Sequence, residues 1–248
     1  MSHAGPTLED ELERARDLSV AELADAIESI GFECTRCGAC CKGHGPADDR
    51  EPHTATVFPD EVRAVQDATE TESYDWRDVA RPMPYGLTEG DDGPEGETFE
   101  WALQTDACGD CVFYEESEGA DGTTGACSIH SDRPLICETY PFSVALGGTS
   151  QPMGEAVDSV ALGDQQDPDE TDDEAMTVRA HECEGLGRDI SREDAEELAA
   201  ALKERAVREL EEAIGVRDEY EPVQTESGEV VVHDSEGAKN PDGTPIEE

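Results

Sequence analysis

The sequence predicts an α+β protein in which a small, loop-rich core is flanked by N- and C-terminal helices. Residues 7–30 and 191–214 carry apolar side chains at helical spacing, and each segment opens with a residue that can cap a helix. Short stretches at 99–103 and 112–114 alternate like strands. Between the two helical segments lie nine cysteines, in a chain whose only aromatic residues are 2 Trp, 5 Tyr and 5 Phe.

The helical segments have recognisable starts and stops. Thr7 and Ser19 each stand three positions before an acidic residue, which predicts two capped helices within 7–30, and Gly31 ends the second. Pro59 opens a shorter helix near 59–66. Ser191 caps the C-terminal helix, one face of which is lined by Ala195, Leu198, Ala199, Leu202, Ala206, Leu210 and Ala213.

The remaining segments read as loops, with one further strand at 229–233. We expect a glycine-rich acidic loop at 89–97, an insertion or hairpin tip at 115–124, and a solvated loop at 164–175. These expectations divide the chain into an N-terminal helical segment (1–31), a cysteine-rich core (32–187), a C-terminal helix (188–220) and a polar, flexible tail (221–248).

Charge excludes several classes of partner. The chain has 63 acidic and 17 basic residues, a formal net charge of −46. Nucleic acid and anionic membrane surfaces require clustered cations, so neither is an expected partner. No apolar run approaches the length of about 18 residues that would suggest a bilayer span. The N-terminus lacks the apolar core of a secretory signal, so we expect a cytoplasmic protein.

The same composition suggests adaptation to molar salt. Only three of the 17 cations are lysines, and carboxylates are spread through the chain. At molar salt the Debye length falls to about 3 Å, which screens the repulsion between carboxylates while they keep the protein soluble. We therefore expect cooperative melting, followed by circular dichroism, to weaken at low salt. Equal melting at low and high salt would contradict this halophilic interpretation.

The first cysteine group reads Cys-x-x-Cys-x-x-Cys-Cys and consists of Cys34, Cys37, Cys40 and Cys41. A Cys-x-x-Cys step lets two thiolates reach one ion from a single turn, and Gly38 supplies the backbone freedom that such a turn uses. Three cysteines at successive gaps of two also match the opening of a ferredoxin-type motif. The adjacent side chains at 40 and 41 diverge, so they serve two metals, or one of them bridges or stays free.

The second group comprises Cys108, Cys111, Cys127 and Cys137, with Cys183 further along the chain. Pro134 and Pro141 disfavour a continuous helix around Cys137, and such fixed bends suit a loop built around an ion. The odd cysteine count and the lack of an export signal argue against disulfides. In a reducing cytoplasm, clustered thiols are more often metal ligands or redox groups.

In this order the motifs resemble the YkgJ-type cysteine-cluster family. The matching motifs are the first cysteine group, Cys111-x-Phe113, Gly125-x-Cys127-x-Ile129, Arg133-Pro134-x-x-Cys137, Tyr140-Pro141 and Cys183-x-Gly185, over roughly residues 32–187. Members are described as zinc- or iron-chelating proteins and sometimes as iron–sulfur proteins. The resemblance implies eight metal ligands, namely Cys34, Cys37, Cys40, Cys41, Cys111, Cys127, Cys137 and Cys183. Cys108 lies outside the pattern, and His130 and Glu138 depart from it.

A few other residues can contribute to such a site. His44, His130 and His181 each lie within three residues of a cysteine, and imidazole suits zinc and iron alike. Arg133, one of few cations, can hydrogen-bond a thiolate or balance charge; its alternative is a surface ion pair. The sequence has no phosphate-binding loop, nucleophile elbow or His-Glu-x-x-His motif, so no catalytic or cofactor-binding residue is assigned.

The sequence therefore predicts a core organised by metal, in which eight thiolates bind zinc or iron as two tetrathiolate centres or one multinuclear centre. Zinc implies a structural or sequestering module. Iron implies an iron–sulfur cluster with electron transfer or sensing, and the successive gaps favour iron slightly. The alternative is a metal- or iron–sulfur-dependent enzyme, such as a redox protein or, because flagellin-lysine methylases share the cysteine pattern, a methyltransferase-like protein. The predicted partners are metal ions.

Overall fold

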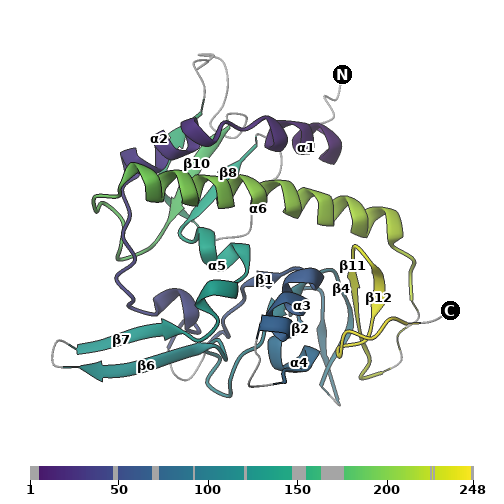
Figure 1. The fold of residues 1–248 in the computed structure, drawn as a ribbon. Coiled ribbons are helices and arrows are strands. Elements are labelled where there is room, and N and C mark those ends of the chain that lie inside the picture. The colour runs from purple at the N-terminus through teal and green to yellow at the C-terminus, as the bar shows by residue number, and fades with distance from the viewer. Residues whose placement is uncertain are drawn as a thin grey trace. The chain divides into compact units, whose positions relative to one another are not determined.

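A computed structural model describes residues 6–46, 50–68, 73–91, 93–119, 122–146, 155–162, 176–223, 225 and 227–246. The helices in this part of the chain are α1 (Leu8–Asp17), α2 (Val20–Ile30), α3 (Pro59–Ala68), α4 (Trp76–Val79), α5 (Leu135–Thr139) and α6 (Arg192–Glu219), with 3-10 turns η1 (Ala39–Cys41) and η2 (His130–Asp132) (Figure 1). The strands are β1 (Thr56–Val57), β2 (Ala80–Pro82), β3 (Thr88–Gly90), β4 (Gly93–Thr98), β5 (Trp101–Leu103), β6 (Tyr114–Gly119), β7 (Gly122–Cys127), β8 (Phe142–Ala145), β9 (Ala156–Ala161), β10 (Thr177–His181), β11 (Val230–Asp234) and β12 (Gly237–Lys239). This mixture confirms the predicted α+β class.

The chain divides into two compact units. The first comprises Met1–Cys37 and Glu138–Glu211, and the second comprises Gly38–Cys137 and Glu212–Glu248. Each unit has its own sheet structure and its own buried apolar residues. In the part of the chain that is described, no helix has both the length and the apolar character needed to cross a membrane.

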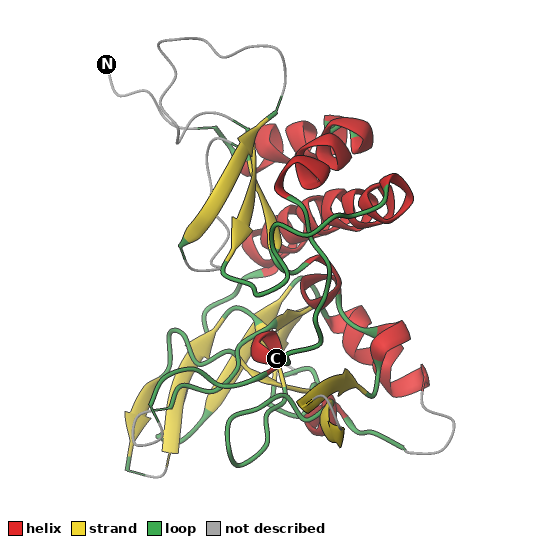
Figure 2. Cartoon of the chain, turned by 90° about the vertical axis from the view of Figure 1, so that its left-hand side faces the viewer, coloured by secondary structure: helices red, strands yellow, loops and turns green. Residues whose placement is uncertain are grey.

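The first unit is built on an antiparallel three-stranded sheet in the order β8-β10-β9. Helices α1, α2 and most of α6 belong to the same unit, and Figure 2 shows the helices gathered on one side of the strands. Leu23 and Ile27 of α2 are fully buried, as is Val178 of β10. The apolar faces of the helices therefore pack on this sheet to form the core of the unit.

The helix boundaries of the first unit follow the predicted caps. Thr7 and Asp10 form a capping box at the start of α1, and the Ser19 side chain accepts a hydrogen bond from the backbone of Glu22 at the start of α2. Gly31 ends α2 with φ of 78°, and a Cβ there would lie 2.5 Å from the Arg188 carbonyl oxygen. Only glycine fits this exit, which leads the chain towards the first cysteines.

The predicted apolar face of the C-terminal helix is largely confirmed in α6. Of the face residues, Ala195, Ala199, Leu202, Ala206 and Leu210 are buried. Leu198 is half-buried and Ala213 is exposed, which corrects the prediction at those two positions. Ala213 lies beyond Glu211, where α6 leaves the first unit. The apolar residues therefore continue at helical spacing after the helix has passed the core of that unit.

The second unit contains three strand assemblies. These are the sheet β1-β5-β2, the sheet β12-β11-β4-β3 and the hairpin β6-β7. Helix α3 forms where the sequence predicts it, with Val62 and Val65 fully buried. They belong to a core that also includes Trp101, Cys111 and Phe113, and Cys41, Cys127 and Cys137 pack against it. The cysteines thus lie at the edge of the main apolar core of this unit.

Two predictions of local structure are wrong in this unit. The acidic stretch 89–97 is mostly strand, in the β3-β4 hairpin, because β4 also pairs in parallel with β11 from the far end of the chain. The predicted strand at 112–114 is a turn, in which the Tyr114 amide donates to the Cys111 carbonyl, and β6 begins only at Tyr114. The hairpin tip predicted at 115–124 corresponds to the β6-β7 hairpin, and residues 164–175 lie outside the described residues.

The C-terminal segment also differs from the flexible tail that we predicted for 221–248. The strand expected at 229–233 is present as β11, and it is followed by β12. The two strands pair in antiparallel register, and β11 joins β4 on its other side. Val231 and Val232 are fully buried, so the segment completes the sheet of the second unit.

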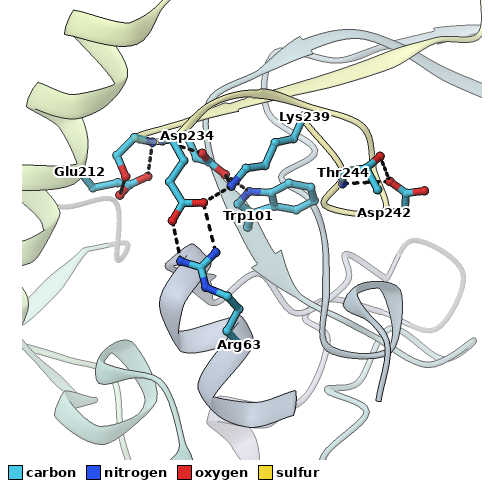
Figure 3. Close-up of polar contacts among 9 residues, drawn as sticks. Arg63, Trp101, Glu212, Asp234, Lys239, Asp242 and Thr244 are labelled. Carbon is cyan, nitrogen blue, oxygen red and sulfur yellow. Dashed lines mark hydrogen bonds and ion pairs between the residues drawn. The ribbon is translucent and has the colours of Figure 1, made fainter. Parts of the chain in front are cut away.

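A polar network fixes these last strands, as Figure 3 shows. Lys239 Nζ lies 2.7 Å from Asp234 Oδ2, and both side chains are buried. Trp101 Nε1 donates to the same carboxylate at 2.8 Å. Lys239 also binds Glu236, which accepts two hydrogen bonds from Arg63 of α3. We call Lys239, Asp234, Trp101, Glu236 and Arg63 the Lys239 network.

Candidate metal centre

Five of the predicted ligands belong to the second unit and come from four segments. Cys40 and Cys41 lie on η1, and their sulfur atoms are 3.8 Å apart. Cys111 lies in the turn before β6, Cys127 ends β7, and Cys137 lies in α5. A backbone hydrogen bond of 2.8 Å from the Cys111 amide to the Cys41 carbonyl ties two of these segments together.

Packing brings these five cysteines to one core: Cys111 belongs to it, Cys41, Cys127 and Cys137 pack against it, and Cys40 lies beside Cys41. Burial, with smaller contributions from the charges of Cys127 and Cys40, raises the pKa of Cys111 to about 11. Burial also raises the pKa of Cys137 well above its ordinary value, with added repulsion from Cys111, Cys127 and Cys40. A divalent cation among the thiolates would replace their mutual repulsion with attraction. The donor set therefore fits a metal that prefers sulfur ligands.

Cys40 and Cys41 form an unequal pair. The hydrogen bond from Cys41 lowers the pKa of Cys40 to about 7, and the Arg133 charge contributes in the same direction. The same hydrogen bond raises the pKa of Cys41, with further contributions from burial and from Cys137 and Cys111. Cys40 is therefore the thiol of this pair that ionises first, and it is exposed to solvent.

Backbone amides point at several of the sulfurs. The backbone amides of Phe113 and Ile129, each two residues after a cysteine, lower the pKa of Cys111 and of Cys127 against the opposing effect of burial. In the first unit, the Gly185 amide donates to Cys183 Sγ at 3.4 Å. Amide donors of this kind stabilise thiolates and orient metal ligands.

Other side chains hold the segments that carry the thiols. Glu61 of α3 accepts hydrogen bonds from the Phe58 and Leu135 amides, both at 2.9 Å, so it fixes the start of the helix that carries Cys137. The Arg133 charge partly offsets the burial that raises the pKa of Cys127, and it contributes to the lowered pKa of Cys40, which supports its interpretation as a charge-balancing residue. No sequence pattern singled out Glu61, because carboxylates are common throughout the chain.

The other three predicted ligands, Cys34, Cys37 and Cys183, belong to the first unit. Phe32 and Leu186 form an isolated β-bridge, and the Glu33 amide donates to the Gly185 carbonyl at 3.1 Å. Cys34 and Cys183 therefore lie on adjacent segments. Cys34 and Cys37 are exposed, and Cys183 is half-buried.

The remaining candidates have local partners. Cys108 is exposed, and its amide donates to Asp106. His130 Nε2 lies 3.2 Å from Arg133 Nη1, and the ring of buried His181 lies 2.8 Å from Ser143 Oγ. His44 pairs with Glu51 through its backbone. Among the described residues, no three side chains of His, Cys, Asp or Glu are arranged closely enough to hold a metal ion as they stand.

This combination of an α+β fold with clustered free thiols is that of a cysteine-cluster protein. The model of the CxxCxxCC family, described as a "Putative zinc- or iron-chelating domain", matches residues 33–184. The chain belongs to this family, as the resemblance in the sequence predicts. No curated protein and no solved structure matches the chain.

Proposed function

We propose that this protein is a zinc- or iron-chelating module with no catalytic activity of its own. The observation that carries the proposal is the gathering of five cysteines of the second unit at one core, where Cys41, Cys127 and Cys137 pack around buried Cys111 and the Cys40 sulfur lies 3.8 Å from that of Cys41. Four segments of the chain contribute to this set, so one ion bound there would cross-link all four. Metal binding would thereby supply folding free energy.

The residues around the thiols have complementary roles in this proposal. Amides of Phe113 and Ile129 favour thiolate at Cys111 and Cys127, and Arg133 offsets part of the negative charge. A bound zinc or iron ion would supply the positive charge that lets the remaining thiols ionise. Membership of the family and the fit of the donor set support metal binding in general, and the successive cysteine gaps favour iron.

We include Cys34, Cys37 and Cys183 in the proposed ligand set. The Gly185 amide already donates to Cys183 Sγ, and Cys34 lies on the adjacent segment. A Cβ at Gly185 would lie 2.3 Å from the Glu33 carbonyl oxygen, so glycine is needed where the two segments meet. The close approach of these segments supports a shared role for their cysteines.

The proposal extends to the surroundings in which the protein works. All nine cysteines are free thiols, which suits the reducing cytoplasm that we infer for it. The net charge of −46 supports the halophilic adaptation inferred from composition, and it opposes any role in nucleic-acid binding.

Anaerobic purification followed by elemental analysis and visible spectroscopy tests the proposed function. We expect zinc or iron to co-purify in stoichiometric amounts. A brown protein with visible absorption and bound sulfide would identify an iron–sulfur cluster, and a colourless protein with stoichiometric zinc would identify a zinc module. If neither metal co-purified and a chelator left the melting curve unchanged, the proposal would fail.

A further inference from the structure

A polar cluster holds the turn that carries Cys40 and Cys41. Lys42 Nζ forms an ion pair with Glu116 Oε1 and lies 5.3 Å from the centroid of the Tyr114 ring. Tyr114 Oη donates a hydrogen bond of 2.8 Å to the same Glu116 oxygen. Each of the three side chains therefore interacts with the other two. We call Lys42, Tyr114 and Glu116 the Lys42 latch.

The latch reaches both ends of η1. At its C-terminal end Lys42 directly follows Cys41, and its amide donates to the Ala39 carbonyl at 3.4 Å. At the other end Gly38 has φ of 74°, and a Cβ there would lie only 1.9 Å from Tyr114 Oη. The tyrosine thus rests directly on the start of the turn.

The same tyrosine connects η1 to a second cysteine segment. Tyr114 begins β6 and is the strand partner of Cys127 at the end of β7. One side chain therefore contacts the turn of Cys40 and Cys41, while its backbone pairs with the strand of Cys127. This placement is suited to holding two cysteine segments in one arrangement.

We propose that the Lys42 latch positions the Cys40 and Cys41 thiolates for metal binding, an inference that rests on the proposed chelating function. The Lys42 and Glu116 side chains are 34% and 41% exposed, and ion pairs of that exposure add little to global stability. The Lys42–Glu116 ion pair instead orders η1 locally. This order favours metal binding, because preorganised ligands lose less conformational freedom when they bind. Groups that orient metal ligands typically change metal affinity by about 10–100-fold.

The test compares variants of the full chain by competition with a chromophoric chelator, using Zn²⁺ and then Co²⁺ as probes. We expect Lys42→Met and Glu116→Ala each to weaken metal affinity about tenfold. Lys42→Arg keeps the cation and its ion pair, so this variant should bind metal with the affinity of the parent. Glu116→Ala leaves the Lys42 charge in place. A loss of metal affinity in that variant would therefore come from the broken ion pair and not from a missing cation.

Two further readouts separate positioning from folding. The d–d spectrum of the Co²⁺ forms should change in the Lys42→Met and Glu116→Ala variants, because it reports ligand geometry, while the melting of the metal-free variants should match the parent. Arg77→Met breaks an exposed ion pair with Asp242 in the same unit and should leave affinity unchanged. Parent-like affinity in both latch variants, or an equal loss in Arg77→Met, would overturn the inference. Failure of the parent to bind either ion would instead overturn the proposed function, and the inference with it.

Discussion

Replacing Lys239 with methionine should lower the free energy of unfolding by about 3–5 kcal/mol. The Lys239 and Asp234 side chains are 4% and 1% exposed, and removing one partner of a buried ion pair leaves an uncompensated buried charge. Asp234 would keep its hydrogen bonds from Trp101 and from the Glu236 amide, but these neutral donors replace only part of the lost interaction. Urea denaturation at neutral pH, followed by tryptophan fluorescence, measures the change.

The control for this prediction is Arg77→Met, which breaks the exposed pair between Arg77 and Asp242. Exposed pairs contribute about 0–1 kcal/mol, so this variant should unfold almost as the parent does. A loss below about 1 kcal/mol in Lys239→Met would contradict the role that we assign to the buried pair.

Acid should weaken the same network. Hydrogen bonds from Arg63 and then Lys239 lower the pKa of Glu236 to about 2, from an ordinary value of 4.5. Because the folded-state pKa is depressed, the stabilisation is present above about pH 4.5 and is lost as the pH falls towards 2. Lys239→Met removes one of the two hydrogen-bonding cations. The free energy of unfolding of this variant should therefore fall less steeply than that of the parent as the pH is lowered through this range.

Metal-loaded protein should melt well above metal-free protein, and Cys111→Ser should lose most of that difference. A metal present at a thousandfold excess over its Kd adds about 4 kcal/mol to the stability of the folded state. For a protein of this size, that corresponds to a rise in Tm of about 8–16 °C. Cys111 is the buried thiol of the candidate set, and serine is a poor ligand for metals that prefer sulfur.

Cys108→Ser is the matched control for Cys111→Ser. Cys108 is exposed and lies outside the family pattern, so its variant should keep the full metal-dependent rise in Tm. Scanning calorimetry with and without a chelator measures both variants on one scale. An equal loss in both variants would contradict the ligand set, as would an undiminished rise in Cys111→Ser.

Local features of the chain were predictable because their causes are local. The caps at Thr7, Ser19 and Ser191 place polar oxygens against free amides within one turn, and Gly31 ends a helix through its own backbone freedom. The apolar face of α6 follows from a period of 3.6 residues. The face continues past the core only at Ala213, where the chain has already left the first unit.

The errors arose where a distant segment decides the local structure. The acidic stretch at 89–97 has a composition typical of a loop, yet its second half becomes β4 because β11 supplies backbone partners from more than 130 residues away. The C-terminal tail is ordered by the Lys239 network, whose partners Arg63 and Trp101 lie far earlier in the chain. The residue pattern within a short stretch of sequence carries no information about pairing with such distant segments.

The candidate site shows the same division. The type and spacing of the cysteines were enough to indicate sulfur-ligand chemistry and the family, because a run of four thiols within eight residues has few other uses. The supporting residues were not predictable. Lys42 follows the cysteine motif but belongs to no recognised sequence motif of its own. Glu61 is one of many carboxylates in the sequence, and only the fold shows that α3 brings it to the start of α5.

By itself the sequence determined the acidic character, the helix boundaries and the membership of a cysteine-cluster family, since each depends on composition or on neighbours within a few residues. Only the tertiary structure decided which cysteines lie together. It groups Cys40, Cys41, Cys111, Cys127 and Cys137 in one unit, and Cys34, Cys37 and Cys183 in the other. The physical reason is that loop closure costs little more for a long loop than for a short one, so packing rather than distance along the chain selects the partners.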